Sequence, residues 1–202
     1  MNGIQLPVSI RTMRLFWPNL IVYYPEVYGM ADTVVQQKIN TEILKQVDRL
    51  IRDQGYYQNP MTQITGYYEI KTNERNILSL ALINYAFSGG AHGLTIMRSL
   101  TFDVVSGKSY QLKELFKKDS DYVKVLSEIV GVQIKERDLP LLEEYNGIKP
   151  DQDYYIADKC LVLYYQLYEL VPYAYGFPYF PISVYEIQDI IDEDGPLGRM
   201  IW

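Results

Sequence analysis

Histidine occurs once in this chain, as His92 in the segment Ser88-Gly89-Gly90-Ala91-His92-Gly93. An imidazole that titrates near neutral pH can act as a general base or as a metal ligand. A hydrolytic site would also need a nucleophile or a water-activating partner, for which Glu169 and Asp103 are the candidates. No sequence spacing supplies such a partnership. We therefore favour a structural histidine whose ring bonds nearby backbone, and keep the hydrolase as an alternative.

Carboxylates alternate twice along the chain, as they do in calcium-binding loops. Asp119 and Asp121 form one pair, and Asp151 and Asp153 form the other. Neither is followed by the Gly and the distal Glu of an EF-hand, so helix capping and turn solvation explain them better. The single cysteine, Cys160, allows no internal disulfide and no cysteine zinc site, and we expect a buried, inert thiol. We predict no metal site and no cofactor.

Tyrosine is the most unusual feature, with 20 in 202 residues, nine of them between positions 154 and 185. Its side chain offers a large contact area, a polar tip and little rotamer entropy, so it is enriched at recognition surfaces. We predict a ligand-binding surface around residues 168–179. The candidate residues are Tyr164, Tyr168, Glu169, Tyr173, Tyr175, Tyr179 and His92. The alternative is a sheet whose half-buried positions favour Tyr for its β propensity.

Composition and charge exclude several classes of protein. The formal net charge is −6, which argues against sequence-independent binding of nucleic acid. No run of 18 apolar residues indicates a membrane span. Residues 1–10 carry no positive charge and no apolar run, so they do not resemble a secretory leader. If Met1 is the true start, the sequence predicts a cytoplasmic protein.

Hydrophobic periodicity predicts two main helices. In residues 33–52 an apolar residue recurs every four positions, and Thr33 to Gln36 fits a capping box. A second stripe begins near residues 119–120 and runs to Ile134. The C-terminal residues 192–202 are charged and then rich in Gly and Pro, which suggests a loose tail.

Strand patterns surround these helices. We expect strands at residues 8–16, 20–24, 64–72, 77–87, 94–103, 110–112, 153–157 and 160–167. The segment 77–87 is apolar on both faces, which indicates a central strand. The strand order reads as a meander, which implies antiparallel sheets. The fold class is therefore α+β, with two halves packed as one compact unit: residues 1–88 and residues 89–202.

Several segments together resemble a bacterial family of paired domains of unknown function. They are the segment at residues 88–93, Thr101-Phe102-Asp103-Val104-Val105-Ser106-Gly107-Lys108, Leu112-Lys113-Glu114-Leu115-Phe116, and Tyr155-Ile156-Ala157-Asp158 through residues 168–176 to Ile182. Family members include the ectodomain of the lysozyme-sensing anti-sigma-V factor and the N-terminal region of a peptidoglycan deacetylase. Residues 8–87 look like the family's N-terminal partner domain. The resemblance implies an α+β fold, a bacterial source, and binding more than catalysis.

Three functions remain open at this point. The favoured one is a non-catalytic binding or sensor module, related to cell-envelope stress domains, that recognises a protein or a glycan. The second is a small cell-wall or sugar hydrolase that uses His92. The third is a cytoplasmic structural protein whose aromatic surface is a self-interface. The family resemblance gives an exported or envelope location as the alternative to the cytoplasm.

Overall fold

The computed structural model describes residues 7–201, so most of the segment considered as a leader lies outside the described residues. The chain divides into two compact units, Met1–Ser109 and Tyr110–Trp202. This division lies later in the chain than the boundary expected between residues 88 and 89. The reason is strand β5 (Leu94–Asp103), which pairs along its whole length with β4 (Ile77–Phe87) and so belongs to the first unit.

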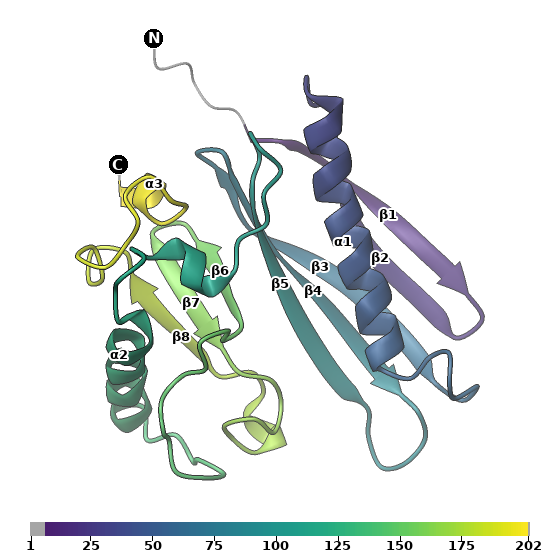
Figure 1. Ribbon diagram of the computed structural model, residues 1–202. Coiled ribbons are helices and arrows are strands. Elements are labelled where there is room, and N and C mark those ends of the chain that lie inside the picture. The colour runs from purple at the N-terminus through teal and green to yellow at the C-terminus, as the bar shows by residue number, and fades with distance from the viewer. Residues whose placement is uncertain (1–6, 202) are drawn as a thin grey trace. The chain divides into compact units, whose positions relative to one another are not determined.

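The first unit is a five-stranded sheet with one long helix (Figure 1). The strands lie side by side in chain order: β1 (Ser9–Trp17), β2 (Leu20–Tyr28), β3 (Gln63–Glu74), β4 and β5. Helix α1 (Thr33–Asp53) connects β2 to β3. All neighbouring strands are antiparallel except β2 and β3, which are parallel. The α+β class is confirmed, but the first sheet is mixed and not a pure meander.

The parallel pair is a consequence of the long helix. Because each helical residue rises about 1.5 Å, the 21 residues of α1 return the chain to the end of the sheet where β2 began. The next strand must then run in the same direction as β2. The parallel ladder is short, from Leu20 opposite Ile64 to Val22 opposite Gly66.

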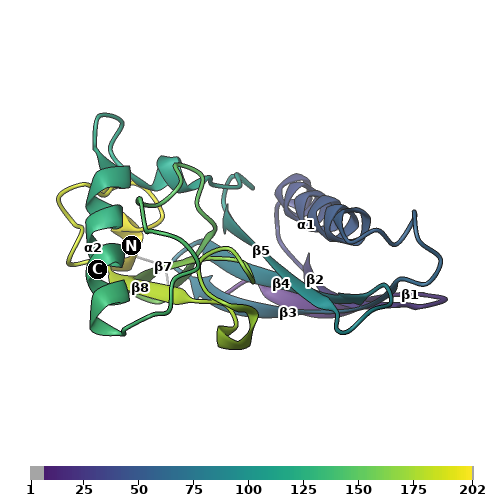
Figure 2. The ribbon, with the colours of Figure 1, turned by 90° about the horizontal axis from the view of Figure 1, so that it is seen from below.

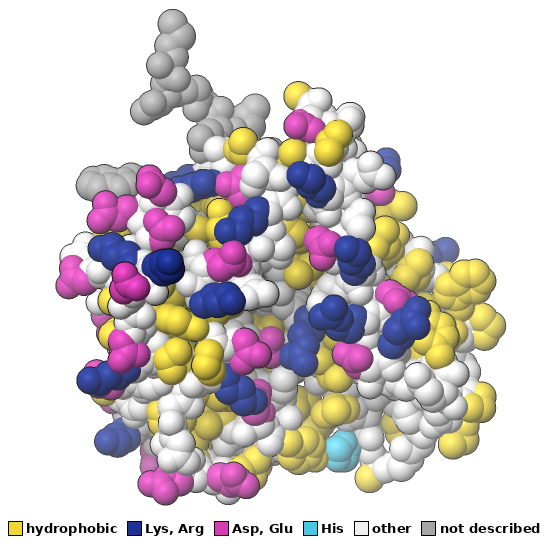
Figure 3. Space-filling model, in the orientation of Figure 1, with side chains coloured by type: hydrophobic (Ala, Val, Ile, Leu, Met, Phe, Trp, Pro, Cys, Tyr) yellow, Lys and Arg dark blue, Asp and Glu magenta, His cyan; other side chains and the backbone are white. Residues whose placement is uncertain are grey.

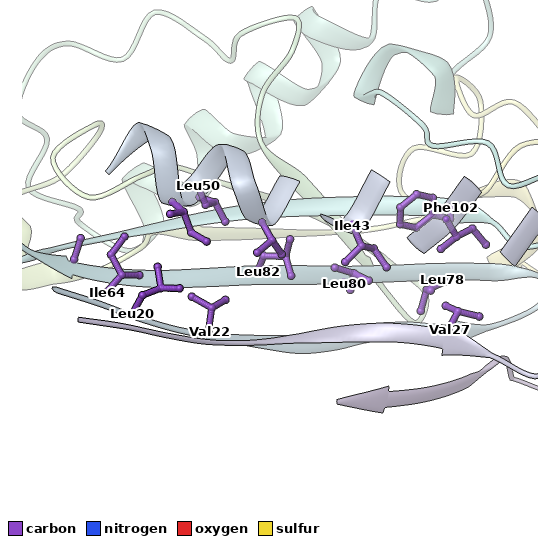
Figure 4. Close-up of a cluster of buried hydrophobic side chains, with 14 of the residues drawn as sticks. Leu20, Val22, Val27, Ile43, Leu50, Ile64, Leu78, Leu80, Leu82 and Phe102 are labelled. Carbon is purple, nitrogen blue, oxygen red and sulfur yellow. The ribbon is translucent and has the colours of Figure 1, made fainter. Parts of the chain in front are cut away.

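Helix α1 covers one face of this sheet (Figure 2). It begins after Asp32, whose carboxylate accepts hydrogen bonds from the backbone N–H groups of Val34 and Val35. Asp32 is therefore the N-cap, one residue before the predicted Thr33. The predicted apolar stripe is buried against the sheet, where Ile43 and Leu50 pack among aliphatic side chains of β2, β3 and β4 (Figure 4).

Strand β4 is buried on both faces, as its continuous apolar run predicted. Leu78, Leu80 and Leu82 face α1 and join the core. On the other face, the Ser79 hydroxyl lies 2.9 Å from that of Thr101 in β5, so the buried polar groups pair across the strands.

The second unit is a three-stranded antiparallel sheet with helix α2 (Tyr122–Glu136). The strand order is β6 (Tyr154–Ala157), β7 (Cys160–Tyr164) and β8 (Tyr179–Ser183). Helix α2 adjoins β8, where the Gln133 side chain donates to the Pro181 carbonyl at 2.8 Å. Three short helices complete the unit: η1 (Leu112–Leu115), η2 (Tyr173–Tyr175) and α3 (Gly198–Ile201). Strand β7 ends at Tyr164, three residues earlier than predicted, and Cys160 is half-buried.

The C-terminal segment is not a loose tail. Leu197 and Met200 are fully buried, and Gly198 begins helix α3. A Cβ on Gly198 would lie 2.1 Å from the Glu193 carbonyl oxygen, so the chain folds back closely on itself here. The prediction of a tail was wrong because two core side chains, Leu197 and Met200, follow the charged run 192–194. Trp202 lies outside the described residues.

Candidate binding surface

The predicted tyrosines separate into buried and exposed groups. Tyr164 is fully buried in β7, where its ring centroid lies 6.0 Å from that of Tyr155 and 6.3 Å from that of Tyr179. It therefore cannot present its ring to a ligand, which corrects its place among the candidates. The physical reason is that residues 161–164 of β7 are buried on both faces of the small sheet.

Tyr168 and Tyr173 lie together beyond the end of β7. The Tyr168 side chain is 50% exposed, and its ring centroid lies 5.3 Å from that of the half-buried Tyr173. The backbone of Tyr168 has φ of 65°, in the left-handed region that aromatic residues seldom adopt. Such a conformation persists only where the surrounding structure fixes it. The backbone that carries the Tyr168 ring is therefore fixed by its surroundings.

Tyr175 and Tyr179 follow in the same segment, residues 168–179, which we call the tyrosine loop. Tyr175 is 59% exposed at the end of η2, and its N–H donates to the Pro172 carbonyl at 2.9 Å. Gly176 has φ of 71° and donates to the Tyr173 carbonyl, which closes the turn. Tyr179 is 36% exposed, with its ring against Tyr155 and Phe177. The loop thus presents three exposed phenol rings on a hydrogen-bonded backbone.

Glu169 supports this loop from within. Its carboxylate pairs with the Lys149 ammonium at 2.6 Å and accepts the backbone N–H of Gln166 at 2.7 Å. The hydrogen bond to Glu169 raises the pKa of the Lys149 ammonium. A carboxylate engaged on both oxygens is suited to holding a turn and poorly suited to accepting a substrate proton.

Tyr165, next to the loop, anchors it in the second unit. Its side chain is buried and its ring packs edge-on against Phe180. Its N–H donates to the Pro178 carbonyl at 3.3 Å, which joins the two ends of the loop. Burial raises the pKa of the Tyr165 hydroxyl far above its ordinary value. This residue stays neutral and fixes the base of the loop.

His92 lies in the first unit, in the exposed connection between β4 and β5. Its Nδ1 lies 2.9 Å from the Gly93 carbonyl oxygen, which fits the predicted ring-to-backbone contact. Asp103 stands at the other end of β5, and ten residues of strand span about 30 Å. The Asp103 carboxylate also accepts the N–H groups of Val105 and Ser106 in a turn. His92 and Asp103 therefore do not form a catalytic pair.

Sequence reasoning missed a second aromatic group, on the sheet of the first unit. The large side chains that its strands expose include Phe16, Ile21, Tyr23, Tyr67 and Tyr85. The signal was present in the alternation of buried and exposed positions along β2 and β3. It was overlooked because the tyrosines of the last third are denser in the sequence.

Across residues 7–201, His, Cys, Asp and Glu side chains do not gather in a group of three that could hold a metal ion. No helix in that range is both long enough and apolar enough to cross a membrane. On the face that Figure 3 displays, Lys and Arg side chains are interspersed with Asp and Glu.

Two family models match the chain, one in each unit. Residues 19–95 match the model described as Deacetylase PdaC. Residues 113–185 match the model described as Protein of unknown function (DUF3298). The boundary between the two units falls between these matches.

A curated relative spans both units. The peptidoglycan-N-acetylmuramic acid deacetylase PdaC of Bacillus subtilis (strain 168) is 22% identical over 212 residues. The match covers 95% of this chain but only 42% of that protein's length. The chain thus corresponds to less than half of the relative.

Two crystal structures share the fold. A DUF3298 family member from Bacteroides fragilis superposes with a TM-score of 0.70 at 12% identity, over 96% of this chain and 97% of that one. A DUF3298 family protein from Pseudomonas aeruginosa PAO1 gives 0.66 at 15% identity, over 93% and 94%. The two family models and the Bacillus subtilis relative, together with this shared fold, confirm the resemblance predicted from the sequence, to the bacterial paired domains found in a peptidoglycan deacetylase.

Proposed function

We propose that this chain is a non-catalytic binding module of the bacterial cell wall, which recognises a glycan or a protein through the tyrosine loop. One observation carries the proposal. Tyr168, Tyr175 and Tyr179 expose their rings on a loop whose backbone is fixed by its own hydrogen bonds. Rigid phenol rings lose little entropy on binding and provide both apolar contact and a hydrogen-bonding tip.

The relatives favour the cell wall as the place of action. The similar protein from Bacillus subtilis is named for a reaction on peptidoglycan. This chain matches 42% of that protein, so its part there can be recognition of the same polymer while the reaction takes place elsewhere. The proposal accordingly places the chain at the cell envelope, which fractionation of the producing cells would test.

The geometry of the polar groups supports binding over catalysis. Glu169, the carboxylate nearest the exposed tyrosines in the sequence, is held by Lys149 and the Gln166 backbone. His92 belongs to the other unit and its Nδ1 faces the neighbouring Gly93 carbonyl oxygen. In these contacts both residues bond to nearby backbone, which favours a binding role over acyl or glycosyl transfer.

The test is cosedimentation of the full chain with purified peptidoglycan sacculi. We expect the wild type to bind and the double variant Tyr168→Ala, Tyr175→Ala to bind at least tenfold more weakly. Tyr185→Ala is the matched control, because Tyr185 is 48% exposed in the same unit but lies outside the loop. Equal binding of the double variant and the wild type would remove the tyrosine loop from the proposal.

Two further arms distinguish the ligand and the chemistry. Sacculi stripped with protease should bind as well as untreated sacculi if the ligand is glycan, and should lose binding if it is a wall-attached protein. The same incubations are assayed for released acetate and for new reducing ends. Release that the wild type produces and His92→Ala does not would favour the hydrolase and contradict the non-catalytic module.

A further inference from the structure

The two faces of the first unit's sheet differ: one is covered by helix α1, and the other is exposed at residues of β1, β2 and β3 but buried at Ser79, Ala81 and Ile83 of β4. Helix α1 lies over one face (Figure 2), and we call the exposed part of the opposite face the open face. Along β2, Leu20 and Val22 point into the core, while Ile21 and Tyr23 are exposed. Strand β3 repeats the pattern, so its exposed Tyr67 lies on the same open face.

Strand register places these side chains in rows across the sheet. In the first row, Phe16 of β1 lies opposite Ile21 of β2, and Ile21 lies beside Thr65 of β3. Thr65 in turn lies opposite Tyr85 of β4. In the next row, Tyr23 pairs with Arg14 and Tyr67 pairs with Ile83. We call this set the open-face cluster, with exposed fractions of 63% for Phe16, 38% for Ile21, 41% for Tyr23, 50% for Tyr67 and 42% for Tyr85.

The rings of Tyr85 and Phe16 each pack against a neighbouring group of the sheet. The Tyr85 ring lies directly over the backbone of Gly93, where a Cβ would come within 2.5 Å of the ring carbon Cζ. The Arg14 guanidinium lies over the Phe16 ring, 5.3 Å from its centroid. Because the rings project from strands and not from loops, their mutual spacing is set by the sheet. The strands therefore fix the spacing of the rings, and Tyr85 and Phe16 have contacts that hold them.

The size and charge of the cluster determine what it can hold. Five side chains that are each about half exposed offer a few hundred Å², well below the roughly 800 Å² that each partner buries in a stable protein interface. Arg14 is a cationic neighbour of the cluster, and Glu69, farther along β3, pairs with Lys71 at 2.5 Å. A polyanion or a second copy of the chain would need more charge or more area than this.

From these observations, we propose that the open-face cluster binds an unbranched, uncharged glycan chain, whose pyranose rings lie flat on Tyr23, Tyr67 and Tyr85. The C–H faces of a sugar ring pack on an aromatic face, and its hydroxyls bond to phenol tips and to the exposed Thr65. This site is distinct from the tyrosine loop, which belongs to the second unit. The inference does not rest on the proposed function of that loop.

Titration of the full chain with the soluble β-1,4-linked hexamer of N-acetylglucosamine tests the inference, by calorimetry and by amide NMR shifts. We expect the strongest shifts at the cluster. Tyr67→Ala and Tyr85→Ala should each weaken binding about tenfold, as buried aromatic contacts do. Tyr67→Phe keeps the ring and should retain most of the affinity.

Controls separate this surface from others. Tyr57→Ala removes a ring that is 60% exposed in the same unit but outside the cluster, and it should bind as the wild type does. Tyr185→Ala removes an exposed ring of the second unit that lies outside the tyrosine loop, and it should also bind as the wild type does. Because amide shifts at the cluster are read separately from those at the loop, failure of the loop proposal does not count here. Absence of hexamer binding at millimolar concentration, or equal losses in Tyr57→Ala, would overturn the inference. Light scattering that shows a dimer broken by Tyr67→Ala would assign the cluster to a second copy instead.

Discussion

Gly66 of β3 lies opposite Asn84 of β4, and the space that a Gly66 side chain would fill is taken by the Asn84 amide. A Cβ on Gly66 would lie 2.2 Å from Asn84 Oδ1 and 2.9 Å from a methyl carbon of Val22. Asn84 is 2% exposed, and its backbone carbonyl accepts a hydrogen bond from Gln54 at the end of α1. The glycine thus allows a buried amide to fit between helix and sheet.

Gly66→Ala should destabilise the chain by about 1–3 kcal/mol, because the new methyl group must displace the Asn84 side chain or Val22. Urea denaturation followed by circular dichroism measures the loss. Thr65→Ala, the neighbouring exposed position, is the control and should change stability by less than about 1 kcal/mol. A Gly66→Ala midpoint equal to that of the wild type would show that the amide can move without cost.

Asp32→Ala should cost about 1 kcal/mol, because it leaves the N–H groups of Val34 and Val35 without their capping carboxylate. Thr33→Ala is the discriminating control, since the sequence predicted Thr33 to start a capping box and the structure gives the cap to Asp32. Thermal unfolding of both variants decides the point. A larger loss for Thr33→Ala than for Asp32→Ala would restore the sequence-based cap.

The unfolding free energy should fall as the pH rises above about 10, the ordinary pKa of tyrosine. Burial raises the pKa of Tyr165 in the folded chain. As the pH rises above about 10, the Tyr165 hydroxyl therefore ionises in the unfolded chain before it does so in the folded chain, which stabilises the unfolded chain. The raised pKa of Lys149 acts in the same direction, because its pairing with Glu169 is lost on deprotonation. Below about pH 10 both contributions are intact.

The measurement for this pH dependence is urea unfolding at a series of pH values from about 9 to 11. Tyr165→Phe should flatten the fall, because it removes the hydroxyl that the unfolded chain ionises. Tyr175→Phe, at an exposed position, should leave the fall as steep as in the wild type. The same slope in the wild type and Tyr165→Phe would show that Tyr165 does not contribute.

Met200→Ala should destabilise the chain by about 2–5 kcal/mol, the usual cost of emptying a fully buried site. Asp194→Ala changes an exposed residue of the same segment and should have little effect. Denaturant midpoints of the two variants provide the comparison. If Met200→Ala were as stable as the wild type, residues 192–201 would not contribute to the core, as the sequence suggested.

The sequence pattern was enough to predict those elements in which the buried positions follow one regular pattern. The four-residue spacing of Val35, Ile39 and Ile43 predicted α1, and the two-sided apolar run of β4 predicted an interior strand. It could not predict that β2 and β3 are parallel, because that depends on where α1 delivers the chain. Local patterns carry no information on that long-range geometry.

The candidate surface was predicted in part for a similar reason. Tyr168 and Tyr175 are exposed as expected, but Tyr164 is buried although it has the same chemistry. Because strand β7 is buried on both faces, its sequence has no alternation that separates an inward Tyr from an outward one. Met200 was missed because the Gly and Pro residues before it resemble a linker more than a core segment.

The short parallel ladder has a mechanical meaning. Strands β1 and β2 are joined to each other along nine residue pairs, and β3 to β4 along eleven, but β2 meets β3 over three pairs only. Parting the sheet at that seam breaks few backbone hydrogen bonds, so the seam is its weakest line. The open-face rows cross this seam from Ile21 to Thr65, and a ligand lying along them would fasten the hairpin to the rest of the sheet.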